Sequence, residues 1–395
     1  MRVTGRARRH RPRRRPGVRA RDRHGWIRAT GYHESVAGEL DAYALDRLHA
    51  ESPVRIQHRS GALWIVNVAG MLRLGLSDGD HPGVERGADG LPTGRLWRAD
   101  SLLRNLLPPS DPPVLTAVGS RLLQHGITAV TDATPDLTPD TIEALAAAAA
   151  SGTLPQRLCL LGAPLSGELP TPLTAGPYKI VLADSGLPNL ATLADRIRAA
   201  HAAGRSIAAH CVTREALVLL LTALDDAGGQ PGDRIEHAAL VPTELVPDLA
   251  RRGLRVITQP GFLADRGDDY LRDVPPTDLP DLYRCARLIA AGVPLALSSD
   301  APYGPVDPWT VMAAAVHRRT GCGAVTGPDE RLTPKAVLAA YLAPSNDPGG
   351  PPRRIVIGAP ADLVLLNRPL DQALAELPRN PVRTTLMAGH PAPAP

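Results

Sequence analysis

The chain has 395 residues, of which 44% are hydrophobic and 21% are charged. These proportions are ordinary for a globular protein, and the length is enough to bury a large core. No apolar run reaches the roughly 18 residues that a membrane-spanning helix needs. The four cysteines have no Cys-x-x-Cys spacing. This excludes a disulfide scaffold and a cysteine-rich zinc module, and it favours a location in the reducing cytoplasm.

The positive charge is concentrated at the N-terminus. Residues 1–28 contain 12 arginines and one acidic residue, Asp22, for a net charge of +11. The whole chain carries +4, so the remainder carries −7. We expect residues 1–23 to form a disordered Arg-rich arm. Nucleic-acid binding by this arm stays open, because clustered arginines can neutralise phosphates, but no aromatic residue precedes Trp26 to stack on bases.

The first elements predicted along the chain are two short strands within 54–68, around the turn residues Ser60 and Gly61. Residues 77–95 are rich in Gly, Asp and Pro and predict a loop. Short apolar strands then alternate with amphipathic helices such as 190–203 and 215–227. The expected strands are 126–134, 156–164, 177–185, 206–212, 232–239, 254–261 and 294–302.

This alternation predicts an α/β fold with parallel strands that are covered by helices. The strands begin about 28 residues apart on average, which favours a TIM-type (β/α)8 barrel. A doubly wound open sheet is the alternative. Only seven strands are found, so we expect strand one to be missing or disrupted before residue 126. No Gly-rich phosphate-binding motif follows a strand, so nothing indicates nucleotide binding.

Beyond the last of these strands, helices are expected at 309–319 and 334–342, and strands at 354–367 and 382–390. The expected organisation is an arm at 1–23, an insertion or substrate-side region at 24–125, the barrel at 126–343, and the C-terminal part of a small β-subdomain at 344–395.

Four chemically capable residues lie at the expected strand ends: Lys179, His210, His237 and Asp300. Catalytic groups of such barrels lie at the carboxyl ends of strands, so we expect these four to converge at one mouth. Each also has a simpler interpretation. His210 alone would be a core histidine, and His237 a surface ion-pair partner. Asp300 would cap a turn, and Lys179 would be a solvated lysine. Four such residues at matching positions favour a shared site.

The chemistry that uses this set is metal-assisted hydrolysis. Imidazoles and carboxylates bind Zn²⁺ and similar ions, which activate water and polarise carbonyl groups. A strand-end aspartate such as Asp300 can take the proton of the water and pass it to a leaving nitrogen. Lys179 and Lys335 are the only lysines of the chain. A lysine amine can be carboxylated by CO₂ to give an anionic oxygen ligand, which a permanently charged arginine cannot readily form.

These motifs resemble the amidohydrolase superfamily, and in particular amidohydrolase family 3, which comprises metal-dependent amide and formamide hydrolases. The four strand-end motifs are YKIVLADS, IAAHCV, RIEHAAL and LSSDAPYGPVDPW. Supporting segments are HGWIRATGYHES (24–35), HRSGALWIVN (58–67), ADGLPTGRLW (88–97), GITAVTDATPD (126–136) and GAPADLVLLN (358–367). The resemblance covers roughly residues 24–390.

The resemblance implies a divalent metal cofactor, with zinc as the expectation. It implies that a carboxylated Lys179 bridges two ions, that His210 and His237 hold the second ion, and that Asp300 binds the first and moves protons. The implied activity is hydrolysis of carbon–nitrogen bonds other than peptide bonds in a small amide. A homodimer is left open, and no membrane partner is expected.

The chain departs from the family pattern in three places. The family's first barrel strand ends in a His-x-His pair that holds the first metal, and none of the 12 histidines here forms such a pair. Ala62 stands where the family often has His, and Val212 and Thr213 stand where it often has Gly-Asp. Substrate contacts at those positions are therefore not carried over.

Three interpretations remain. The chain derives from an active hydrolase whose start is missing, in which case residues 1–23 are not native. Alternatively it is a non-catalytic relative that binds ligands, or it binds nucleic acid through the arm. On the first interpretation we expect at most one tightly bound ion, at Lys179, His210 and His237, with weak amide hydrolysis or none.

Overall fold

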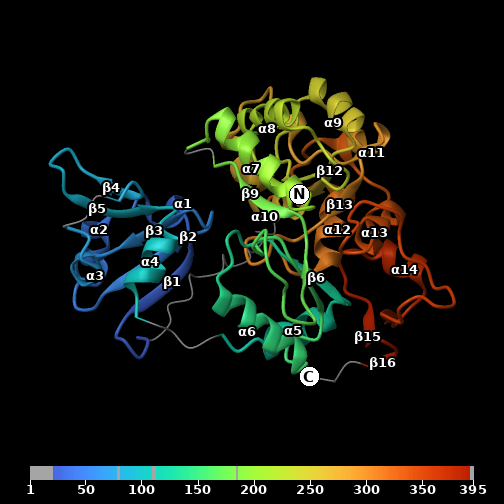
Figure 1. Cartoon of the computed structure of the whole chain (residues 1–395), viewed down its shortest axis with the longest axis horizontal. Helices are drawn as coiled ribbons and strands as arrows, with labels where there is room; N and C mark the ends of the chain where they lie inside the picture. The colour runs from blue at the N-terminus through green and yellow to red at the C-terminus, as the bar shows by residue number, and fades with distance from the viewer. Residues whose placement is uncertain (1–20, 78–80, 109–112, 184–185, 392–395) are drawn as a thin grey trace, which may run out of the picture. The chain divides into compact units, whose positions relative to one another are not determined.

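The computed structural model describes residues 21–77, 81–108, 113–183 and 186–391. Residues 1–20, which make up most of the expected arm, lie outside the described residues. The chain divides into two compact units, residues 1–111 and residues 112–395. In Figure 1 the first unit runs from blue to cyan and the second from green to red.

Unit 1 is built on a five-stranded sheet with the order β1-β2-β3-β5-β4. Its strands are β1 (Ile27–Tyr32), β2 (Val54–His58), β3 (Leu63–Val66), β4 (Val84–Arg86) and β5 (Pro92–Trp97). Its helices are α1 (Glu34–Ala37), α2 (Ala42–Leu48), α3 (Val68–Leu74) and α4 (Asp100–Leu106). The β1–β2 pair is parallel and the other pairs are antiparallel. Alternate residues of β3 belong to different apolar clusters, because both faces of this sheet are covered.

The two strands expected within 54–68 are confirmed as β2 and β3. The loop expected at 77–95 is wrong, because β4 and the first four residues of β5 fall inside it. The proline and the glycine that suggested a loop have specific roles in β5. Pro92 stands at the first position of β5, where proline is tolerated. At Gly94, with φ of 84°, a Cβ atom would lie 2.5 Å from the carbonyl oxygen of Val66, so only glycine allows this close approach.

Unit 2 contains all seven strands expected between residues 126 and 302, and each is shorter than expected. They are β6 (Ala129–Asp132), β7 (Arg157–Leu160), β9 (Tyr178–Val181), β10 (Ile207–Cys211), β11 (Arg234–His237), β12 (Arg255–Thr258) and β13 (Leu295–Leu297), with a short additional strand β8 (Thr174–Ala175). Strands β9 to β13 form one parallel sheet, and β6 to β8 form a second. The backbone N–H of Lys179 donates to the carbonyl of Leu161 at 3.1 Å and joins the two sheets.

The parallel strand order agrees with the sequence interpretation, but a closed barrel is not formed by the described residues. There, β6 and β13 are edge strands that each pair on one side only. This is the place where an eighth strand was expected to be missing or disrupted.

Helices alternate with most strands of unit 2 along the chain, although none separates β7, β8 and β9 (Figure 1). They are α5 (Thr116–Gln124), α6 (Pro139–Ala150), α7 (Leu190–Ala202), α8 (Arg214–Ala227), α9 (Val246–Arg252), α10 (Gly261–Asp273), α11 (Ala286–Ala290), α12 (Pro308–His317), α13 (Pro334–Leu342) and α14 (Leu370–Ala375), with 3₁₀ turns η1 (Thr243–Leu245), η2 (Leu279–Asp281) and η3 (Pro328–Glu330). Short polar residues such as Asn189 and Thr213 accept backbone N–H groups and so begin α7 and α8. No described helix is long and apolar enough to span a bilayer.

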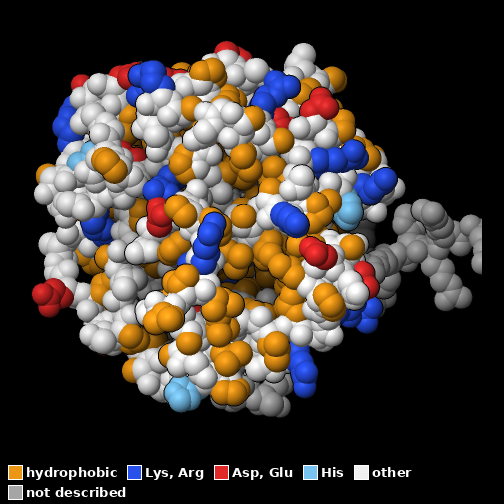
Figure 2. Space-filling view, turned by 90° about the vertical axis from the view of Figure 1, so that its right-hand side faces the viewer, with side chains coloured by type: hydrophobic (Ala, Val, Ile, Leu, Met, Phe, Trp, Pro, Cys, Tyr) orange, Lys and Arg blue, Asp and Glu red, His pale blue; other side chains and the backbone are white. Residues whose placement is uncertain are grey.

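The C-terminal strands form a small antiparallel sheet of β14 (Leu363–Leu366), β15 (Val382–Met387) and β16 (His390–Pro391). The strand expected at 354–367 is therefore half wrong, because 354–362 contains no regular structure. No described strand pairs with this segment, and Ile355 and Ile357 are exposed. Figure 2, which looks at the side where α13 and α14 lie in Figure 1, shows hydrophobic side chains gathered on the surface.

Candidate active site at the strand ends

The register of the parallel sheet separates an apolar face from a polar face. Ile180, Ala209 and Ile235 are fully buried in the core that includes residues of α7 and α8. Lys179 pairs with Ala208, and His210 pairs with Val181 and Glu236. Paired residues of neighbouring strands point to the same face, and alternate residues point to opposite faces. Lys179, His210 and Glu236 therefore share the face away from that helix-covered core.

The sequence interpretation placed Lys179 at the end of a strand. The structure places it within β9 instead. It is two residues, about 7 Å, before the level of His210 along the sheet. Its side chain is long and interacts electrostatically with Glu236 and Asp300. Lys179 is only 5% exposed. Burial lowers the pKa of its amine and outweighs the attraction of the two carboxylates. The expectation of a solvated lysine is therefore wrong.

His237 reaches the same region because its backbone leaves the strand geometry. Regular alternation would turn it to the helix side with Ile235. Instead His237 has a φ of 73° and Ala238 a φ of 45°. The His237 ring lies 4.5 Å from the ring of His210 at an interplanar angle of 74°. Left-handed backbone is costly for residues other than glycine and is concentrated at functional sites.

Gln259, which the sequence analysis did not single out, fixes the His237 ring. It follows β12 directly and is 2% exposed. Its Nε2 donates to the carbonyl of Ile257 at 3.1 Å and to Ser298 Oγ at 2.9 Å. Its Oε1 lies 2.9 Å from His237 Nδ1 and accepts that proton. His237 Nε2 is then the lone-pair nitrogen that a metal needs. The strand-end rule used for the other site residues would have found Gln259.

Asp300 completes the group from beyond the end of β13. It also has left-handed backbone, with φ of 50°. Its Oδ2 lies 4.0 Å from His237 Nδ1. Burial raises the pKa of this carboxyl, although His237 and Lys179 act in the opposite direction. Burial likewise lowers the pKa of His237, which favours the neutral imidazole.

A buried ion pair lies on the same sheet face. Arg234 Nε donates to Glu236 Oε1 at 2.7 Å, and both side chains are nearly fully buried. Burial alone would raise the pKa of Glu236, but Arg234 and Lys179 lower it overall. The simpler interpretation of His237 as a surface ion-pair partner is wrong, because its side chain is only 12% exposed.

The structure thus brings His237 next to both His210 and Asp300, and places Lys179 within electrostatic reach of Asp300. Within the described residues, the ligand atoms of His210, His237 and Asp300 do not all lie within 4.8 Å of one another. The set of donors nevertheless fits a divalent transition ion, since His237 offers an oriented, neutral nitrogen and Asp300 offers a carboxylate.

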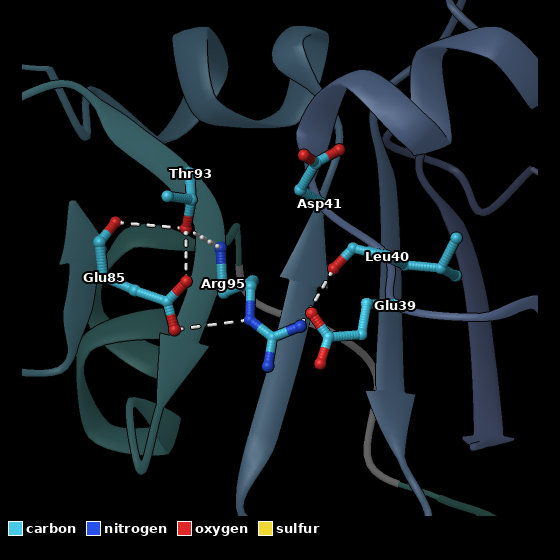
Figure 3. A pocket seen from close by; sticks show the side chains of 6 residues that line it. All are labelled: Glu39, Leu40, Asp41, Glu85, Thr93 and Arg95. Atoms are coloured by element: carbon cyan, nitrogen blue, oxygen red, sulfur yellow. Dashed lines mark hydrogen bonds and ion pairs between the residues drawn. The ribbon is translucent and has the colours of Figure 1, made fainter. Parts of the chain in front are cut away.

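A separate cavity of about 330 Å³ lies in unit 1 (Figure 3). It is lined by Glu39, Leu40, Asp41, Glu85, Thr93 and Arg95. Arg95 Nε donates to Glu85 Oε2 at 3.3 Å, and its Nη1 donates to the Leu40 carbonyl at 3.2 Å. The guanidinium charge is therefore paired with a residue that lines the cavity. None of the strand-end residues lines this cavity.

Parallel strands that present imidazole, carboxylate and buried amine groups on one face define an α/β protein with a cluster of potential metal ligands at its strand ends. The chain belongs to the Amidohydrolase family, whose sequence profile matches residues 2–392.

Two curated relatives match the sequence. The N-substituted formamide deformylase of Arthrobacter pascens is 32% identical over 162 residues, which are 40% of this chain and 30% of that protein. The provisionally named amidohydrolase YtcJ of Bacillus subtilis (strain 168) is 26% identical over 344 residues, which are 75% of this chain and 64% of that protein. The matches thus span less than two thirds of the length of either relative.

Solved structures share the fold. An uncharacterized metal-dependent hydrolase from Pyrococcus horikoshii OT3 aligns with a TM-score of 0.61 at 19% identity, over 82% of this chain and 75% of that chain. One from Pyrococcus furiosus aligns with a TM-score of 0.59 at 20% identity, over 82% and 72%. At these identities the likeness concerns the fold alone.

Proposed function

We propose that this chain carries a metal-dependent hydrolase site that cleaves a carbon–nitrogen bond, other than a peptide bond, in a small-molecule amide. The observation that carries the proposal is the position of His237. Its ring lies 4.5 Å from that of His210, its Nδ1 lies 4.0 Å from Asp300, and Gln259 holds that Nδ1. Membership of the Amidohydrolase family supports this chemistry. The deformylase named among the relatives supports formamides and related amides as the substrate class.

In this proposal His210, His237, Asp300 and a carboxylated Lys179 hold the ion, with zinc as the expected metal. When bound, the ion would supply Lewis acidity that activates water and polarises the amide carbonyl. The barrel-type arrangement of the strands would bring these residues to one mouth.

Asp300 is the proton carrier in this scheme. Its carboxylate takes a proton from the attacking water and delivers it to the leaving nitrogen. A raised pKa suits this role, because a base works best when its pKa approaches the working pH. The burial of Asp300 and its position beside His237 therefore both support its role as the proton carrier.

Lys179 is the residue that CO₂ would modify. Burial lowers the pKa of its amine, which increases the neutral fraction. The neutral nitrogen attacks the CO₂ carbon, an N–C bond forms as one C=O π pair moves onto oxygen, and the nitrogen releases one proton to solvent. The product is an anionic carbamate with two oxygen donors.

The test compares the two lysines and the site histidines. Hydrolysis of N-formyl and N-acyl amines and bound zinc are measured for the native chain, Lys179→Arg, His237→Asn and the matched control Lys335→Arg, which changes the exposed lysine. We expect Lys179→Arg and His237→Asn to lose hydrolysis and the zinc ion of unit 2, and Lys335→Arg to keep both. A folded native chain with neither hydrolysis nor a zinc ion that depends on Lys179 and His237 would instead favour a non-catalytic ligand-binding relative.

A further inference from the structure

In unit 1, the carboxyl ends of two neighbouring parallel strands also lie side by side. Strands β1 and β2 are parallel, and Tyr32 pairs with His58 at their last positions. His33 and Glu34 follow β1 directly, and Glu34 begins α1. The side chains after β1 and at the end of β2 therefore share one edge of the sheet.

Three side chains converge at this edge with metal-ligand spacing. Glu34 Oε2 lies 3.1 Å from His58 Nε2 and 3.6 Å from His33 Nε2. The three ligand atoms all lie within 4.8 Å of one another, and within the described residues no other His, Cys, Asp or Glu group does so. Ligands about 2.1 Å from a tetrahedral zinc ion are about 3.4 Å apart. The two measured separations lie on either side of that value.

His58 is held in the orientation that a ligand needs. Its Nδ1 accepts the backbone N–H of Ser60 at 3.1 Å and lies 2.7 Å from Ser60 Oγ, which accepts the backbone N–H of Ala62 at 3.2 Å. The Tyr32 ring packs edge-on against the His58 ring at 6.0 Å. Because Nδ1 accepts, Nε2 carries the proton in the metal-free chain and donates it to Glu34 at 3.1 Å. A metal ion would replace that proton, and Nδ1 would then carry a proton and donate it to Ser60 Oγ. A hydrogen bond from the second imidazole nitrogen is the usual support of a metal-bound histidine.

The donor set and its exposure define the kind of ion. Two imidazoles and one carboxylate suit Zn²⁺ and neighbouring transition ions better than Mg²⁺ or Ca²⁺, which prefer oxygen ligands. The side chains of His33, Glu34 and His58 are 18%, 36% and 14% exposed, so the group is ordered by its surroundings yet open to solvent. Three protein ligands leave at least one coordination position for water or another ligand.

We propose that His33, Glu34 and His58 form a zinc-type metal site in unit 1. None of these residues belongs to the strand-end set of unit 2, and the proposal does not rest on the proposed hydrolase activity. The ion would join the ends of β1 and β2 to the start of α1.

The experiment counts zinc in the full-length chain after removal of metal and re-equilibration with zinc alone. The native chain is compared with His58→Gln and with His24→Gln, a matched control elsewhere in unit 1. We expect His58→Gln to hold one ion fewer per chain and His24→Gln to hold as many as the native chain. The difference is one ion whether unit 2 binds zinc or not. Failure of the proposed function therefore changes the total and leaves this difference unchanged.

Glu34→Gln separates metal binding from a structural role, because its amide oxygen can still accept a hydrogen bond from His58 Nε2. We expect this variant to keep its metal-free thermal unfolding temperature while its zinc Kd rises about tenfold or more. Cobalt substitution should give the native chain visible absorption bands that weaken in both site variants. Equal zinc content in the native chain and in folded His58→Gln, or an unchanged zinc Kd in Glu34→Gln, would overturn the proposal.

Discussion

Replacement of Gln259 by leucine tests how the His237 ring is oriented. The Gln259 side chain makes three hydrogen bonds, at 2.9, 2.9 and 3.1 Å, while nearly fully buried. At about 0.5–1.5 kcal/mol each, their loss should lower the free energy of unfolding by about 1.5–4.5 kcal/mol. Leucine restores little, because the methylenes of Gln259 are already buried.

The functional effect should be larger than the stability effect alone explains. Without Gln259, the proton of His237 is no longer fixed on Nδ1, so Nε2 is no longer reliably the lone-pair nitrogen. Loss of such a supporting group typically costs about 10–100-fold in metal affinity or activity. We expect that loss for zinc binding by unit 2, measured by competition with a chelating dye in the His58→Gln background.

Two further variants isolate the cause. Gln259→Glu keeps an oxygen acceptor for His237 Nδ1, so it should retain most of the zinc affinity. Ser298→Ala removes one of the three hydrogen bonds without touching His237, so it should cost about 1 kcal/mol in urea unfolding and leave zinc binding unchanged. The reasoning is refuted if folded Gln259→Leu binds zinc as tightly as its parent.

Three other outcomes are expected. Glu236→Gln leaves a buried arginine without its partner and should cost about 3–5 kcal/mol at pH 7. Because the folded-state pKa of Glu236 is lowered, the difference from the native chain should shrink as pH falls below the unfolded-state value of about 4.3; urea melts with an equal difference at pH 4 and 7 would contradict this. A thiol-specific dye should label only Cys322 in the native state, since the other three cysteines are buried and burial raises the pKa of Cys285 to about 12; stoichiometric labelling counts the sites, and more than one rapid label would be inconsistent with this burial. Ile357→Lys should raise soluble yield with no loss in unfolding temperature, because Ile357 is fully exposed on an unpaired apolar segment; unchanged pellet fractions would show that this segment does not drive aggregation.

The alternation of strands and helices in unit 2, and most of the residues that carry chemistry, can be predicted from local sequence. Apolar runs bounded by glycine and short polar caps indicate which segments form parallel strands, because both features are local, although each strand is shorter than its apolar run. The same rule singled out His210, His237 and Asp300. It would also have found Gln259, and it fits the His33 and His58 positions in unit 1.

The face of the sheet on which a side chain lies, and the side chains that it contacts, depend on tertiary packing. Periodicity places His237 on the helix side of the sheet, and only its left-handed backbone turns the ring toward His210. Burial of Arg234 and Glu236 depends on the strands beside them, so residues that appear solvated in the sequence form an internal ion pair. The segment before β14 has the apolar pattern of a strand, yet it forms none, because no described strand pairs with it. Local pattern therefore sets the elements and the reactive groups, whereas side-chain environment and strand pairing depend on contacts between residues distant in the chain.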